Sequence, residues 1–64
     1  MSALVLISGG VHQLEDDIVA ILGIVETALA VLAEGDPVRA DLEEIRTAAR
    51  IAVTKTEALA ARAA

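Results

Sequence analysis

The sequence predicts an all-α protein: an antiparallel two-helix hairpin that pairs with a second copy to form a homodimeric four-helix bundle. Apolar residues recur in alternating steps of three and four, the spacing of one helix face, on both sides of a single Gly35-Asp36-Pro37 turn. The chain has only 64 residues, of which 56% are apolar and none is cysteine. A chain this short rarely builds a sufficient core alone, and without disulfides a second copy is the remaining source of buried surface.

The first helix is expected from about residue 2 to about residue 34. Gly9-Gly10 weakens its start, so a bend there, or a beginning at Val11, is the alternative. The predicted apolar stripe consists of Val11, Leu14, Ile18, Ile21, Val25, Ala28 and Leu32. From Ile21 onward the flanking positions are apolar as well. An apolar arc this wide needs more than one neighbouring helix, which is why a second hairpin is predicted.

The turn is expected at residues 35–37, and the second helix from about residue 37 to about residue 62. Gly35 suits the left-handed position after a helix end, Asp36 can cap the next helix, and Pro37 fits its first position. The predicted stripe of the second helix consists of Val38, Leu42, Ile45, Ala49, Ala52, Thr56 and Leu59. Residues 1–64 therefore form a single domain.

Composition excludes several classes of partner. A formal net charge of -5 and the absence of aromatic residues argue against a nucleic-acid ligand. The apolar stretch 18–33 is shorter than the ~20 residues of a membrane span and contains Glu26, so no span is expected. Without cysteine, and with one histidine, no structural metal site is expected. The absent cysteines and the lack of a basic amino-terminal flank favour the cytoplasm.

The one histidine, His12, is the candidate functional residue. It falls outside the apolar stripe, so its side chain is expected on the outer face of the first helix, within reach of a partner. A neutral imidazole nitrogen is a nucleophile near neutral pH. Asp16 follows one helical turn later, so the two side chains are expected to be neighbours. A solvated surface histidine without a chemical role is the other interpretation.

The segment 12–29 resembles the phosphoacceptor helix of the histidine-kinase dimerisation and phosphotransfer domain, and the similarity extends over about residues 9–60. The matching positions in the first helix are His12, Leu14, Ile18, Ile21, Leu22, Gly23 and Glu26. Those after the turn are Asp36-Pro37, Arg39, Asp41 to Ile45, Ala48-Ala49, Ala52, Thr56 and Leu59.

The resemblance implies a homodimeric phosphoprotein in which His12 accepts a phosphoryl group. The donor would be a kinase ATP-binding domain, in cis or in trans, and the acceptor an aspartate of a response-regulator receiver domain. Those partners would supply ATP and magnesium, so this chain would bind no cofactor itself. Gln13 would orient the site by hydrogen bonding, and Asp16 would modulate the imidazole.

Four departures from the family pattern favour a second interpretation. Gln13 stands where the family usually has an acid that assists proton removal, and Asp16 stands where it usually has Asn or Thr. Asp17 replaces the usual Pro or Leu, and the sequence contains no Gly-rich phosphate loop. The alternative is therefore a catalytically silent, self-associating helical hairpin that serves as a structural or adaptor module.

Overall fold

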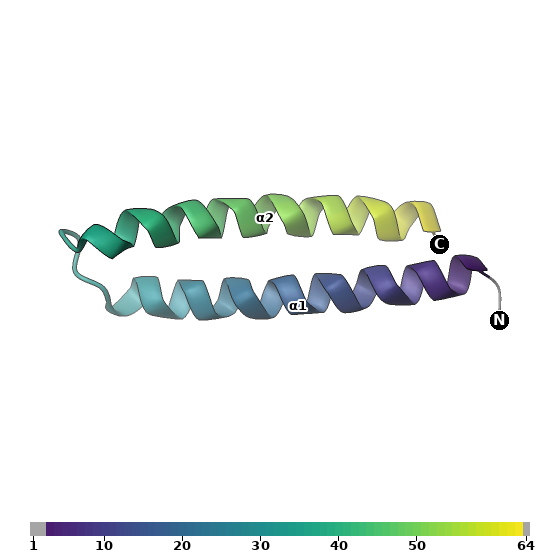
Figure 1. Ribbon diagram of the computed structural model, residues 1–64, viewed down its shortest axis with the longest axis horizontal. Helices are drawn as coiled ribbons and strands as arrows, with labels where there is room; N and C mark the ends of the chain where they lie inside the picture. Colours follow the sequence, from purple (N-terminus) through teal and green to yellow (C-terminus); the bar gives the residue numbers. More distant parts are fainter. Residues whose placement is uncertain (1–2, 64) are drawn as a thin grey trace.

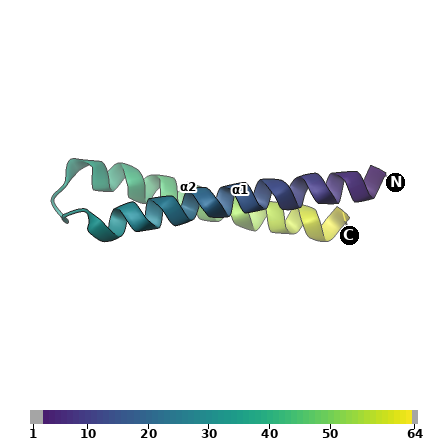
Figure 2. The same cartoon turned by 90° about the horizontal axis from the view of Figure 1, so that it is seen from below.

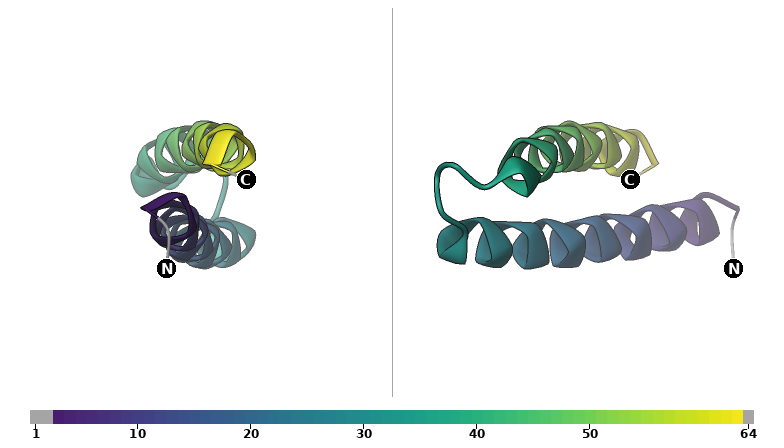
Figure 3. Two further views of the ribbon diagram at one scale, coloured as in Figure 1. Left: turned by 90° about the vertical axis from the view of Figure 1, so that its right-hand side faces the viewer. Right: turned by 60° about the vertical axis from the view of Figure 1, so that its left-hand side comes forward.

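The computed structural model describes residues 3–63, which form two long helices in an antiparallel hairpin. Helix α1 spans Ala3–Val31 and helix α2 spans Pro37–Ala63 (Figure 1). The molecule is elongated, with extents of 51 × 14 × 11 Å. The two helices form a single layer when viewed end-on (Figure 3), and their axes are inclined so that they cross near their middles (Figure 2). The predicted all-α hairpin is therefore confirmed.

Helix α1 runs through Gly9-Gly10 without interruption, so the bend and the later start considered for this dipeptide are not observed. A Cβ atom built on either glycine would meet nothing within 4 Å, so neither is required by close packing. Helix α1 ends at Val31, about three residues before the predicted end.

The connection between the helices confirms two of the three predicted roles. The Val38 amide donates a hydrogen bond of 2.9 Å to Asp36 Oδ1, so Asp36 caps α2, and Pro37 is its first residue. The left-handed conformation predicted for Gly35 is wrong, because no residue in the range 3–63 has a positive φ.

Arg39 explains why a left-handed glycine is not needed. Its Nη1 donates to the carbonyl oxygens of Leu29 and Leu32, at 3.0 and 3.3 Å, and its Nε donates to Glu43 Oε1 at 3.1 Å. The last carbonyls of a helix require partners that the helix itself cannot provide, and a glycine turn is only one source of them. Here a guanidinium from α2 supplies the partners for α1 and ties the two helices together beside the turn.

The contact between the helices is rotated from the predicted stripes. The predicted positions Leu14, Ile21, Val38, Ile45 and Leu59 are about half exposed, whereas the residues that directly follow them are turned inward. In α1 this rotation turns Leu22 and Leu29 inward, whereas Ile21 is exposed. Among the side chains of residues 9–62, the buried ones are Val25, Leu29, Ala49, Thr56 and Ala60. A single pair of helices can bury only a narrow strip of each, so the other apolar residues of the described part are half-buried or exposed.

Candidate functional site

His12, Gln13 and Asp16 are all exposed on α1, in the half of that helix that lies away from the turn. The sequence prediction that the imidazole lies on an outer face is confirmed. Within the described residues, no hydrogen bond or ion pair joins these three side chains to one another or to the rest of the chain. The imidazole is therefore open to a partner, but the hairpin alone does not hold it in a preorganised site.

The side of the hairpin that carries His12 is mainly polar, although the exposed Val19, seven residues after His12, lies there as well. His12 directly follows the inward-facing Val11, in the same way that Glu26 follows Val25 and Arg50 follows Ala49. Residues with the same offset from the helix contact lie on the same side of the hairpin. On this side Arg50 Nη2 and Glu26 Oε1 form an ion pair of 3.1 Å that joins the two helices.

The opposite side collects most of the exposed apolar side chains. Among the described residues, eight of the nine large exposed apolar side chains directly precede a residue that is at least partly turned inward, and seven of these eight remain when Ile51, which lies two residues from both Ala49 and Val53, is set aside. We call these seven residues the apolar face: Leu14, Ile21, Ile24 and Val31 of α1, and Val38, Ile45 and Leu59 of α2. Two antiparallel helices are related by a two-fold axis perpendicular to their common plane. Residues that stand one position before an inward-facing residue therefore lie on the same side of the hairpin in both helices. His12 stands one position after an inward-facing residue and lies on the opposite side.

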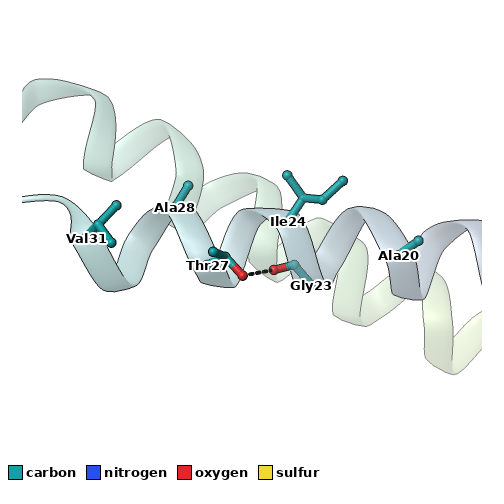
Figure 4. Close-up of a pocket in the computed structure, with 6 residues that line it drawn as sticks. All are labelled: Ala20, Gly23, Ile24, Thr27, Ala28 and Val31. Atoms are coloured by element: carbon teal, nitrogen blue, oxygen red, sulfur yellow. Dashed lines mark hydrogen bonds between the residues drawn. The ribbon is translucent and has the colours of Figure 1, made fainter.

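The apolar face is continuous with a hollow on α1, which we call the α1 groove. It has a volume of about 610 Å³ and is lined by Ala20, Gly23, Ile24, Thr27, Ala28 and Val31 (Figure 4). Ile24 and Val31 are 70% and 81% exposed, more than any other large apolar side chain of the described residues. Thr27 Oγ1 donates to the Gly23 carbonyl at 2.9 Å, so the hydroxyl is satisfied within the helix. The lining thus offers apolar surface without a polar group in need of a partner.

The hairpin exposes more surface than a compact protein of its size. Its accessible surface is 4590 Å², whereas a compact monomer of 6.6 kDa exposes about 3,900 Å². Its radius of gyration is 15.0 Å, against about 11 Å for a globular domain of this length. Across the described side chains, none is fully buried. The two helices together therefore do not form a closed core.

Other classes of site find no support in the part of the chain that the structure describes. No group of three or more His, Asp or Glu side chains could hold a metal ion there. Neither α1 nor α2 has the length and apolar character that crossing a bilayer requires, over residues 3–63. Comparison of the chain with models of known families, with curated proteins and with solved structures found no match.

One structurally important residue was not predicted as such. Arg39 entered the sequence analysis only as a matching position of the resemblance, and its contact with the end of α1 was not anticipated. The signal available in the sequence was an arginine two residues after the proline that begins the second helix. At that position a long side chain can reach back to the helix that has just ended.

Proposed function

We propose that this chain is a homodimeric histidine-phosphotransfer module in which His12 carries the phosphoryl group. The observation that supports the proposal is the position of the chain's one histidine. His12 is exposed on the polar side of the hairpin, opposite the apolar face, so a second copy docked on the apolar face would leave the imidazole accessible. The resemblance of residues 12–29 to a phosphoacceptor helix is the reason for proposing phosphotransfer as the reaction at His12.

The proposed reaction uses the neutral imidazole as the nucleophile. A ring nitrogen attacks the γ-phosphorus of ATP held by a kinase domain, the new P–N bond forms, and the bond to ADP breaks. The other ring nitrogen releases its proton to water or to a base. Gln13 cannot take that proton, and Asp16, one helical turn away, is a nearby carboxylate on the same helix. A receiver aspartate then attacks the phosphorus, the P–N bond breaks, and the imidazole takes up a proton from water as it leaves. Both partner domains supply magnesium, and we place the module in the cytoplasm with them.

The test is phosphorylation of the chain by an active histidine-kinase catalytic domain with labelled ATP. The wild type should gain acid-labile phosphate, and His12→Gln should gain none while its melting temperature stays the same, because the side chain is exposed. Gln13→Glu should raise the rate by about tenfold or more, because it restores a general base beside the imidazole. A His12→Gln variant that still carries the label would exclude His12 as the acceptor.

A silent adaptor is the second candidate, and the charges around His12 favour it. Glu15, Asp16 and Asp17 follow the histidine closely, and their negative charge would repel a phosphoryl dianion. The apolar face would serve self-association equally well without any chemistry at His12. A folded dimer that stays unlabelled beside a kinase known to be active would support the adaptor and refute phosphotransfer.

A further inference from the structure

The side of α2 that faces away from α1 carries a second stripe of regularly spaced residues. Successive members are alternately three and four positions apart, so they lie on one side of the helix. All of them are exposed, and none belongs to the apolar face. We call these residues the outer stripe: Asp41, Glu44, Ala48, Ile51, Lys55, Ala58 and Arg62.

The charge of the outer stripe changes sign along its length. Asp41 and Glu44 make it acidic beside the turn, and Lys55 and Arg62 make it basic toward the other end. The two ion pairs among the described side chains involve none of these four charges. The outer stripe therefore carries charges of both signs that contacts within the hairpin leave available to a partner.

The middle of the outer stripe is apolar. Ile51 is its central residue, and its side chain is 50% exposed although it lies outside the apolar face. Ala48 and Ala58 lie on the two sides of Ile51, and small side chains at a helix contact allow the two axes to approach closely. An apolar centre between charged ends is the arrangement expected of a surface on which another helix packs.

The order of the residues fits the same stripe of a second copy in the antiparallel direction. With a two-fold axis at Ile51, residues equally far from it on either side lie across from each other. Glu44 of one copy then lies across from Ala58 of the other. Ala58 and Leu59 line a hollow of about 300 Å³ together with Lys55 and Arg62. The carboxylate of Glu44 would therefore enter a hollow between two cations, and the symmetry repeats this contact on the other side of the axis.

The parallel direction is disfavoured by the same charges. It would place Glu44 beside Glu44 and Lys55 beside Lys55, and like charges on neighbouring helix positions destabilise the pairing. The complementary charges thus select the direction as well as the partner.

We propose that the outer stripe is a self-association surface on which α2 of one copy packs antiparallel against α2 of a second copy. Ile51 of both copies lies at the two-fold axis, and Glu44 of each lies between Lys55 and Arg62 of the other. This contact uses a different surface from the dimer of the proposed function, and neither depends on the other. Together the two contacts would join dimers into larger assemblies.

Single-cysteine variants test the contact and its direction, because the chain has no cysteine of its own. A disulfide forms only when the two Cα atoms lie within about 7 Å. Ile51→Cys should form a disulfide-linked dimer on mild oxidation, because this residue meets its own copy at the axis. Ala58→Cys is the matched control on the same stripe. The two copies of Ala58 would be about 20 Å apart along the helices, so this variant should remain unlinked.

Charge reversal tests the proposed partners of Glu44. Glu44→Arg and Arg62→Glu should each weaken the association by about tenfold, because an attraction becomes a repulsion in both symmetric contacts. The double variant Glu44→Arg/Arg62→Glu should restore it. Glu34→Arg is the control for the change in net charge, since Glu34 is exposed outside the outer stripe, and it should leave the association unchanged. Sedimentation over a range of protein concentrations measures all four.

The outcomes that overturn the inference are separate from those that overturn the proposed function. An unlinked Ile51→Cys would refute the contact, and an Ala58→Cys variant linked as readily would refute its direction. A double charge variant that associates no better than the single ones would refute the pairing of Glu44 with the two cations. Ile51→Glu should form a species half the size of the wild type, and identical sedimentation of the two would also refute the contact. The dimer and the labelling of His12 are then measured in Ile51→Glu, which keeps the apolar face intact.

Discussion

Arg39→Ala removes the guanidinium that joins the end of α1 to α2, and we expect it to lower the free energy of unfolding by about 2 kcal/mol. Arg39 donates to two carbonyl oxygens of α1, and its side chain is only 27% exposed. Each of these charged hydrogen bonds contributes about 1 kcal/mol after allowance for water that can replace it. The pair with Glu43 adds roughly 0.3–0.5 kcal/mol, as is usual for exposed pairs one helical turn apart.

The assay is equilibrium urea unfolding followed by far-ultraviolet circular dichroism, because the chain has no aromatic residue to serve as a fluorescent reporter. All variants are compared at one protein concentration, since association would shift their apparent stability. Arg39→Lys should lose about half as much as Arg39→Ala, because an ammonium keeps the charge but lacks the planar fork.

Arg50→Ala is the matched control for Arg39→Ala. It also removes an arginine that pairs with α1, but Arg50 and Glu26 are 60% and 46% exposed, so the loss should be about 0.5 kcal/mol. Equal losses from Arg39→Ala and Arg50→Ala would refute the view that carbonyl capping, and not charge pairing alone, fixes the turn.

Four further variants are tested in the same assay. Asp36→Ala should cost about 1 kcal/mol, because it removes the side-chain acceptor of the Val38 amide; no loss would contradict the cap. Gly10→Ala should raise the free energy of unfolding by up to about 1 kcal/mol, because the residue is helical and an added Cβ atom meets nothing there. Gly35→Ala should change the free energy of unfolding by no more than about 0.5 kcal/mol, because the φ angle of Gly35 is not positive. Val25→Glu should cost at least ~3 kcal/mol by placing a charge in the helix contact, and a folded, stable variant would mean that this contact is misplaced.

Local chemistry made the helices and the start of α2 predictable from sequence. Pro37 has no amide to lose at a first helical position, and Asp36 reaches the amide of Val38 without help from the rest of the fold. The conformation of Gly35 was not predictable in this way, because it depends on Arg39 reaching the carbonyls of another helix. From the sequence alone, Gly35 was expected to end the first helix in a left-handed conformation. In the structure, Arg39 from α2 binds the last carbonyls of α1 instead.

The face by which each helix meets the other was predicted only in part. Val25 and Ala49 were placed correctly, but Ile21 and Ile45 lie on the surface. In α1 the apolar arc is so wide that spacing does not decide which part of it faces α2. For the candidate site, the exposure of His12 followed directly from its position outside the stripe. Its chemistry did not follow, because an exposed imidazole has the same place in the helix whether or not a partner phosphorylates it.

The structure of the turn also bears on domain swapping. Two copies of a helical hairpin can exchange halves if each opens into one continuous helix, and short connections often permit this. Here a continuous helix would have to run through Pro37, whose ring clashes with the carbonyl four residues earlier and whose nitrogen has no hydrogen to donate. Opening would also separate the guanidinium of Arg39 from the carbonyls of its own α1. The closed hairpin is therefore protected against exchange at the one place where a swap would have to begin.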